Sequence, residues 1–303
     1  MFTGCGTALV TPFRRDRSLD EGTLRRLIRR QIDAGIDFLV PCGTTGESPT
    51  LTHAEHLRVV EIAIEEAKAG PRKVPVLAGA GGYNTAEVIA MARSLKGLGA
   101  DGILSVTPYY NKPTQEGLYQ HYKAIASNIT LPIIVYSVQG RTGVNVEPAT
   151  LARLAEIPNV IGVKEASGNI GQMANVIQRV PPDFLVLSGD DSITLPLIAL
   201  GGRGVISVVS NEIPAEMTQL AQLCLQGDFA AARVLQRRYL PLMEVNFVES
   251  NPIPVKAAMG MMGLLDPTYR LPMVAPKNES MEKILNVLVD TGLINMRSVP
   301  VAN

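Results

Sequence analysis

The segment Val160-Ile161-Gly162-Val163-Lys164 decides the fold of this chain. Its first four residues form a continuous apolar run, which is typical of a strand in a parallel sheet that helices cover. Lys164 ends this run, and a lysine in such a place must be paired, exposed at the end of the strand, or held neutral. Because a neutral amine is a nucleophile, Lys164 is a candidate for forming a Schiff base with a carbonyl substrate.

Similar apolar runs recur along the chain and predict eight strands. These are residues 6–10, 38–41, 74–78, 102–106, 132–136, 160–164, 184–187 and 204–209. Segments with the apolar spacing of helices, such as Leu24, Leu27, Ile28 and Ile32, lie between the strands. The alternation predicts an α/β fold, a (β/α)8 TIM barrel. A doubly wound sheet would use the same units, but it would normally carry a phosphate-binding glycine motif after its first strand, and none is present there.

The strand signal stops after Gly227. Helical stretches follow at about 229–245, 254–264 and 279–288, separated by turns that contain Pro or Gly. We therefore predict a catalytic barrel over residues 1–226 and a C-terminal helical region over residues 227–303. The sequence Thr52-His53-Ala54-Glu55 has the spacing of a capping box, so a helix is expected to begin at about Thr52.

Composition excludes several classes of partner. The 303 residues are 46% hydrophobic and 18% charged with a formal net charge of +0, so nucleic acid and membrane surfaces are not expected partners. The basic cluster Arg25, Arg26, Arg29 and Arg30 is predicted to be the solvated face of an amphipathic helix. Three cysteines without metal-site spacing, and the lack of a secretory signal or a membrane span, predict a cytoplasmic protein without disulfides.

Polar side chains follow the predicted strands where active-site groups of a barrel gather, at the carboxyl ends. They are Thr44 and Thr45 after the second strand, Tyr109 and Tyr110 after the fourth, Tyr136 at the end of the fifth, Lys164 at the end of the sixth and Gly189 after the seventh, with Arg141 in the loop beyond the fifth. Several of them also have a plainer interpretation. Lys164 could pair with Glu165, and the two threonines could belong only to a glycine-bounded turn. Tyr136 could be a core or rim tyrosine, and Arg141 could be a solvated loop charge.

Taken together, these residues resemble the dihydrodipicolinate synthase family over nearly the whole chain. The motifs that carry the resemblance are Gly43-Thr44-Thr45-Gly46-Glu47-Ser48, Thr107-Pro108-Tyr109-Tyr110-Asn111-Lys112-Pro113, Tyr136 to Gly143, and Gly162 to Gly168. The resemblance implies a class I aldolase type of lyase, usually a homotetramer, that condenses pyruvate with L-aspartate 4-semialdehyde in lysine biosynthesis. It implies no metal and no organic cofactor.

The resemblance also implies a role for each site residue. Lys164 matches the lysine that attacks the ketone of pyruvate, and Thr44 and Thr45 match the pair that holds its carboxylate. A proton relay is implied for Tyr136, Thr45 and Tyr110, with Tyr110 supplied by a neighbouring subunit, and Arg141 matches the residue that binds the semialdehyde carboxylate. Gly189 and Ile206 match positions whose backbone lines the pyruvate pocket. The family commonly has Asn and Pro where this chain has Ser137 and Gln139, which predicts a looser Arg141.

Two further questions stay open at the level of sequence. Ser48, His53, His56, Glu87 and Tyr109 match the effector site of lysine-inhibited relatives, although Tyr83 stands where those relatives usually have an asparagine. The two histidines are otherwise expected to be solvated helix residues rather than a metal pair. The alternative activities are that of a related pyruvate-dependent lyase acting on a sialic or 2-keto-3-deoxy sugar acid, and non-catalytic keto-acid binding. Arg141, Lys164 and the relay tyrosines favour the synthase.

Overall fold

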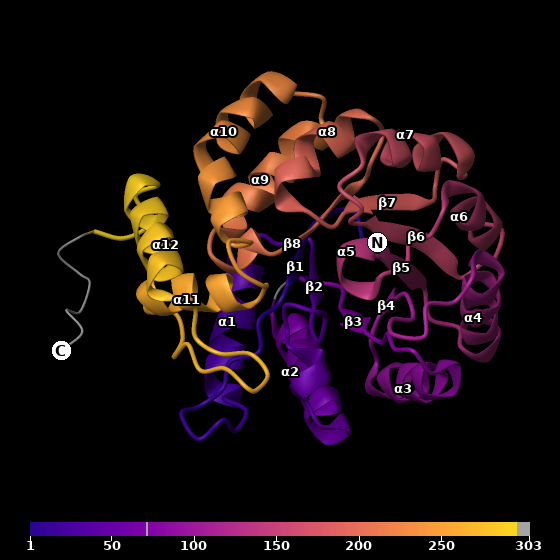
Figure 1. The fold of residues 1–303 in the computed structure, drawn as a ribbon, viewed down its shortest axis with the longest axis horizontal. Coiled ribbons are helices and arrows are strands. Elements are labelled where there is room, and N and C mark those ends of the chain that lie inside the picture. Colours follow the sequence, from indigo (N-terminus) through magenta and orange to yellow (C-terminus); the bar gives the residue numbers. More distant parts are fainter. Residues whose placement is uncertain (71, 296–303) are drawn as a thin grey trace.

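A computed structural model of the chain describes residues 1–70 and 72–295 and contains a parallel sheet of eight strands (Figure 1). The strands are β1 (Gly4–Ala8), β2 (Phe38–Val40), β3 (Leu77–Gly79), β4 (Gly102–Val106), β5 (Ile133–Ser137), β6 (Val160–Glu165), β7 (Leu185–Ser188) and β8 (Gly204–Ser207). Their order is β2-β1-β8-β7-β6-β5-β4-β3. All eight predicted strands and the barrel fold are confirmed.

Helices connect the strands and continue beyond the last one (Figure 1). They are α1 (Glu21–Asp33), α2 (His53–Ala69), α3 (Thr85–Leu98), α4 (Gln115–Asn128), α5 (Gln139–Thr142), α6 (Pro148–Leu154), α7 (Ile170–Arg179), α8 (Thr194–Ala199), α9 (Pro214–Leu225), α10 (Phe229–Val245), α11 (Ile253–Met261) and α12 (Asn278–Asp290), with 3-10 turns at Ser48–Thr50, Asp191–Ile193 and Val209–Asn211. The three helices predicted after Gly227 are therefore confirmed. The division of the chain at residues 226 and 227 stays a prediction.

The barrel closes between β2 and β3. Leu39 N donates to Pro75 O over 2.9 Å, Gly79 N donates to Pro41 O over 2.9 Å, and Leu39 forms an isolated bridge with Val76. The strand predicted at 74–78 begins only at Leu77. Pro75 has no N–H to donate, so the regular ladder starts after it.

Each strand is buried on both faces. Side chains such as Phe38, Leu104, Ile134, Leu187 and Ile206 form one apolar cluster. The alternate residues of the strands face outward and form a larger apolar cluster with the surrounding helices. This two-sided burial explains why the strands are continuous apolar runs rather than alternating ones.

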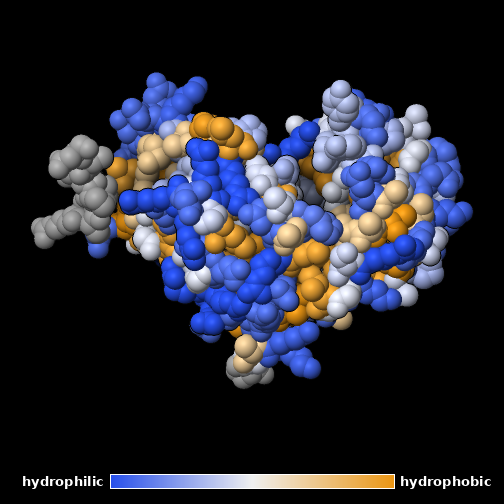
Figure 2. Space-filling view, turned by 90° about the horizontal axis from the view of Figure 1, so that it is seen from below, coloured by the Kyte–Doolittle hydropathy of each residue, from blue (hydrophilic) through white to orange (hydrophobic). Residues whose placement is uncertain are grey.

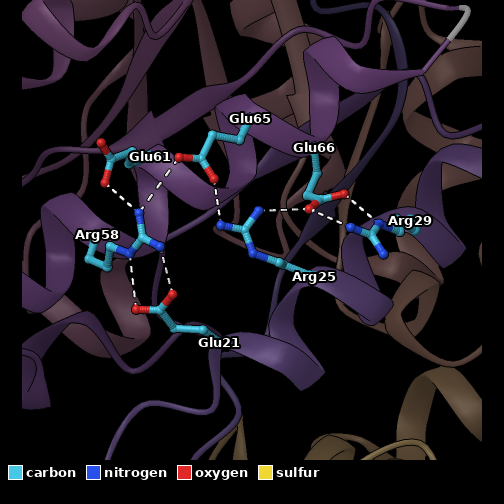
Figure 3. Close-up of polar contacts among 7 residues, drawn as sticks. All are labelled: Glu21, Arg25, Arg29, Arg58, Glu61, Glu65 and Glu66. Carbon is cyan, nitrogen blue, oxygen red and sulfur yellow. Dashed lines mark hydrogen bonds and ion pairs between the residues drawn. The ribbon is translucent and has the colours of Figure 1, made fainter.

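The first two helices carry an ion-pair network on their outer sides (Figure 3). Arg25 pairs with Glu65 and Glu66, and Arg29 pairs with Glu66, at N–O distances of 2.5 to 2.7 Å. The charges of Arg25 and Arg29 are thus balanced by carboxylates of α2. The more exposed Arg25–Glu65 pair stabilises the fold by only about 0–1 kcal/mol, whereas Glu66 is a buried carboxylate that depends on its two arginines. The prediction of a solvated face is wrong for Arg30, whose guanidinium is half-buried and donates to the carbonyl oxygens of Asn211 and Glu212.

The predicted capping box at the start of α2 is present and is tied to the C-terminal part of the chain. Thr52 Oγ1 accepts from Glu55 N over 3.2 Å, and Glu55 Oε2 accepts from Thr52 N over 2.9 Å. Arg270 holds the same carboxylate with two N–O contacts of 2.6 and 2.8 Å. The hydrogen bonds from Arg270 lower the pKa of Glu55 to about 2. The ionised carboxylate therefore stabilises the folded state.

This pairing predicts a pH-dependent loss of stability in Glu55→Gln. Because the pKa of Glu55 is lower in the folded state than in the unfolded state, ionised Glu55 stabilises the folded state fully at pH values above the ordinary pKa of a glutamate. This stabilisation is lost as the pH falls toward 2. Because the side chain is partly exposed, we expect the variant to lose about 1–2 kcal/mol of the free energy of unfolding at pH 7. Chemical unfolding at pH 7 and at acidic pH measures the difference in the free energy of unfolding between the unmodified protein and the variant. This difference should become smaller at acidic pH. A difference that did not change with pH would contradict the view that the charge of Glu55 is its source.

The outer surface is largely hydrophilic in the view from below, with hydrophobic side chains exposed in patches between the polar ones (Figure 2). Among the residues that the structure describes, no helix is both long enough and apolar enough to cross a membrane.

Candidate active site

Lys164 lies on the inner face of the barrel near the carboxyl end of β6. In the sheet register it stands between Tyr136 of β5 and Leu187 of β7, and both neighbours belong to the apolar cluster inside the barrel. Only 5% of Lys164 is exposed, and its Nζ lies 4.3 Å from the centroid of the Tyr136 ring. No carboxylate among residues 1–70 and 72–295 forms an ion pair with this amine.

Glu165 does not pair with Lys164. Successive residues of a strand point to opposite faces, so Glu165 points outward, toward α7. There its carboxylate accepts from Gln172 Nε2 over 2.7 Å and from Ser167 N over 3.2 Å. Burial raises the pKa of Glu165. The ion-pair interpretation of Lys164 is therefore wrong.

Thr44 and Thr45 lie in a tight turn after β2. Gly46 N donates to Gly43 O over 3.1 Å, and Glu47 N donates to Thr44 O over 3.1 Å. Glu47 continues the turn with φ at 52°, in the left-handed region that few side chains adopt. Thr45 is 2% exposed, and its Oγ1 accepts from Asn251 Nδ2 over 3.0 Å. The turn is real, and it also carries both threonines to the carboxyl end of the barrel.

Arg141 and Tyr110 occupy more exposed positions. Arg141 lies in the single-turn helix α5 rather than in an irregular loop, and its guanidinium donates to Asn251 O over 3.0 Å. The side chain is thus exposed to solvent, and a hydrogen bond ties it to the segment before α11. Tyr110 is 91% exposed with φ at 65°, and the structure does not bring it to Lys164 within one subunit.

A cavity of about 660 Å³ opens beside these residues. Its lining includes Thr44, Tyr136 and Arg141 from the predicted active site and Ser48, His53, His56, Glu87 and Tyr109 from the predicted effector site. Lys164, Thr45, Tyr110, Gly189 and Ile206 are not part of the lining. The ring of Tyr136 lines the cavity and also contacts the Lys164 amine. Part of the predicted active site and the predicted effector site therefore line the same cavity.

Gly189 and Ile206 lie on the same side of the barrel as Lys164. A Cβ added at Gly189 would stand 2.6 Å from Ala166 Cβ and 3.2 Å from Lys164 Cε, so only glycine leaves room for the lysine stem. Ile206 is fully buried in the cluster inside the barrel.

The two predicted effector histidines differ in environment. His53 is exposed, but His56 is buried, with its Nε2 at 2.9 Å from Gly79 O. Burial lowers the pKa of His56, so the ring is neutral and donates to that carbonyl. The expectation of two solvated histidines is thus wrong for His56, which α2 turns toward β3. In the described part of the chain, no group of three or more His, Cys, Asp and Glu residues could hold a metal ion.

Sequence reasoning missed Asn251, which lies just before α11, and Lys256, which lies in the first turn of this helix. Asn251 contacts both Thr45 and Arg141. Lys256 is fully buried, and its Nζ donates to Glu47 Oε1 over 2.5 Å. A signal for Lys256 was available, because it interrupts an apolar stretch of the sequence as Lys164 does.

A buried amine that has no carboxylate partner in residues 1–70 and 72–295 and lies beside a phenol inside a (β/α)8 barrel is the arrangement expected of a lyase of the class I aldolase type. The model of the Dihydrodipicolinate synthetase family matches residues 1–291, and the chain belongs to this family.

Individual relatives agree with the family match. The 4-hydroxy-tetrahydrodipicolinate synthase of Koribacter versatilis (strain Ellin345) is 50% identical over 297 residues, which cover 98% of each chain. The crystal structure of the dihydrodipicolinate synthase from Thermotoga maritima has a TM-score of 0.94 at 45% identity and covers 97% of this chain and 100% of its own. A lysine-bound structure of the enzyme from Cyanidioschyzon merolae has a TM-score of 0.93 at 38% identity, with 97% and 99% covered.

Proposed function

We propose that this chain condenses pyruvate with L-aspartate 4-semialdehyde to give 4-hydroxy-tetrahydrodipicolinate, through a Schiff base on Lys164. The observation that carries the proposal is the buried amine of Lys164, which lies against Tyr136 and has no carboxylate partner in the described residues. Family membership and the names of the relatives supply the substrates and place the reaction in lysine and diaminopimelate biosynthesis.

The reaction proceeds in four steps. Lys164 Nζ adds to the ketone carbon of pyruvate, and loss of water gives an iminium ion. The pyruvate methyl group then loses a proton to form an enamine, because the iminium withdraws electrons from the adjacent carbon. The enamine carbon attacks the aldehyde carbon of the semialdehyde and forms the new carbon–carbon bond. Finally the amino group of that substrate attacks the iminium carbon, releases the Lys164 amine and closes the ring.

The remaining site residues bind substrate or move protons. Thr44 and Thr45 hold the pyruvate carboxylate, with the backbone of Gly189 and Ile206 completing the pocket. Arg141 takes the semialdehyde carboxylate, for which its planar guanidinium is suited.

Tyr136, Thr45 and Tyr110 relay the protons between the reacting groups and solvent. In this proposal a neighbouring subunit supplies Tyr110, so a dimer is the smallest active unit and a homotetramer the full assembly. Support comes from the 91% exposure of Tyr110, which leaves its ring available to a second chain. The free, buried state of Cys5, Cys42 and Cys224 supports a cytoplasmic location.

Trapping of the intermediate tests the function. The protein is incubated with pyruvate, reduced with borohydride, digested and mapped by mass spectrometry, and a pyruvate adduct on Lys164 is expected. A second incubation then compares aspartate semialdehyde with sialic and 2-keto-3-deoxy sugar acids. Turnover of a sugar acid without turnover of the semialdehyde would overturn the synthase activity and favour the lyase alternative.

Gln139→Pro is expected to improve binding of the second substrate. Gln139 is the first residue of α5, where proline is well accommodated, and Val138 before it has an extended φ of −141°. If fixing φ orders Arg141 before the substrate binds, it saves about 0.5–1.5 kcal/mol of ordering entropy, which corresponds to a decrease of about two- to tenfold in the semialdehyde KM. Steady-state kinetics with each substrate varied checks this. An unchanged semialdehyde KM would refute the prediction that Gln139 leaves Arg141 less firmly positioned.

We further propose that L-lysine binds at the far end of the cavity. Ser48, His53, His56, Glu87 and Tyr109 all contribute to its lining, and the relative from Cyanidioschyzon merolae has been solved with lysine bound. Glu87 offers a carboxylate to an amino group, so Glu87→Gln should weaken binding by about tenfold or more. Isothermal calorimetry and inhibition assays measure the effect. Absence of both heat and inhibition in the unmodified protein would remove this proposal.

A further inference from the structure

Two buried polar side chains connect the segment after β8 to the end of α10. Glu212 follows the 3-10 turn Val209–Asn211, and Asn246 follows the last residue of α10. Their exposed fractions are 1% and 0%, and Asn246 Nδ2 donates to Glu212 Oε2 over 2.5 Å. This hydrogen bond is thus closed to water, and it joins positions that are 34 residues apart.

The second oxygen of each side chain lacks a partner. Glu212 Oε1 and Asn246 Oδ1 are both buried, and neither forms a hydrogen bond with residues 1–70 and 72–295. A carboxylate oxygen and an amide oxygen can only accept, so an ionised Glu212 leaves both atoms unsatisfied. That arrangement is unfavourable, because each buried acceptor has lost its hydrogen bonds to water and has gained none in return.

The carboxyl group of Glu212 forms no ion pair with the residues that the structure describes. Arg30 of α1 lies nearby, but its guanidinium donates to two backbone carbonyl oxygens, one of them that of Glu212 itself. The carboxylate of Asp191 accepts from the N–H groups of Val208 and Val209, both over 3.0 Å, which favours the ionised form of Asp191. A second negative charge close to Asp191 would be repelled by the first.

These surroundings raise the pKa of Glu212 well above its ordinary range. Burial is the largest cause and the charge of Asp191 adds to it, whereas the hydrogen bond from Asn246 and the charge of Arg30 act in the opposite direction. Burial also raises the pKa of Asp191 to about 6, so Asp191 is ionised at neutral pH. The two neighbouring acids therefore differ in charge, with Asp191 ionised and Glu212 neutral.

We propose that Glu212 is held as a neutral acid that exchanges two hydrogen bonds with Asn246. The Oε1–H group of Glu212 donates to Asn246 Oδ1, and Asn246 Nδ2 donates to Glu212 Oε2. This arrangement gives a partner to both oxygens that otherwise lack one. Loss of the proton at alkaline pH breaks one of the two bonds and places a second charge near Asp191. The pair is therefore a pH-sensitive contact between the segment after β8 and α10.

Glu212→Gln tests the protonation state, because glutamine keeps both hydrogen bonds and has no proton to lose. Its amide nitrogen donates to Asn246 Oδ1, and its oxygen accepts from Asn246 Nδ2. Because the pKa of Glu212 is raised in the folded state, the unmodified protein loses stability as the pH rises from the ordinary glutamate range toward that raised pKa. We expect Tm values within about 1 °C of each other at pH 4, and a Tm about 3 °C or more higher for the variant at pH 8.

Glu55→Gln is the matched control, and its effect has the opposite sign. The hydrogen bonds from Arg270 lower the pKa of Glu55 to about 2, so the same substitution there should lower the Tm at pH 8. If the folded protein did not favour the acid form of Glu212, Glu212→Gln would also lower the Tm at pH 8, or its Tm difference from the unmodified protein would not change with pH. Either result would overturn the proposal.

Infrared spectroscopy detects the proton directly, because a protonated carboxylic acid has a C=O stretching band that is separate from the bands of a carboxylate. At pH 7 the difference spectrum between the unmodified protein and Glu212→Gln should contain a protonated-acid band, and that for Glu55→Gln only carboxylate bands. Absence of the acid band for Glu212 would refute its neutral state. In Asn246→Leu the band should shift, because the acid has lost its acceptor. A band at an unchanged frequency would show that the proton is not bonded to Asn246.

Discussion

Lys164→Met is expected to reduce turnover by about 10³-fold or more, because it removes the nucleophile on which the whole reaction is built. Methionine is unbranched like lysine and fills a similar space, so the barrel interior stays packed. The borohydride adduct with pyruvate should disappear at the same time. Turnover assays and peptide mapping measure the two effects on the same preparation.

The same variant should remain stably folded. Lys164 forms no ion pair with the described residues, and its amine lies over the ring of Tyr136. Because methionine has a similar volume and no ion pair is lost, the free energy of unfolding should change by less than about 1.5 kcal/mol. An inactive variant that also unfolded would not identify a nucleophile. A folded variant that kept its turnover and its adduct would show that the amine lies elsewhere.

The apolar runs of the sequence were sufficient to predict the barrel and the place of Lys164 at the end of a strand. Each of the eight runs is long enough and apolar enough to be a strand buried on both faces, and Lys164 breaks one of them at its carboxyl end. The pairing of Lys164 with Glu165 could also have been excluded from the sequence. Adjacent residues in a strand point to opposite faces, so one of the two had to lie outside the barrel.

Contacts between distant segments could not be predicted in this way. Asn251 is 206 residues from Thr45, and Lys256 is 209 residues from Glu47. No local pattern links such positions, because the contact depends on how α11 packs against the carboxyl end of the barrel. The burial of His56 could not be predicted either, because its hydrogen-bond partner is a backbone carbonyl of β3. Residue types on α2 alone do not reveal that partner.

Lys256 is the counterpart of Lys164, because it is a buried lysine with a structural partner. Its exposed fraction is 0%, and it is enclosed by Glu47, two carbonyl oxygens and the rings of Phe13 and Tyr269. Burial lowers the pKa of Lys256, while the carboxylate of Glu47 opposes that shift by favouring the charged form. The two buried lysines are thus distinguished by their partners, not by their burial.

Lys256→Met is therefore expected to destabilise the protein by about 3–5 kcal/mol, since it leaves the Glu47 carboxylate buried without its cation. That loss is a large part of the ~5–15 kcal/mol that keeps a typical protein folded. Thermal and chemical unfolding of Lys256→Met beside Lys164→Met provides the comparison, with the same substitution in both. Adding Glu47→Gln to Lys256→Met should recover part of the loss, because the neutral amide costs less to bury. If Lys256→Met were as stable as the unmodified protein, the pair would not hold the turn after β2, and Glu47 would need another reason for its left-handed conformation.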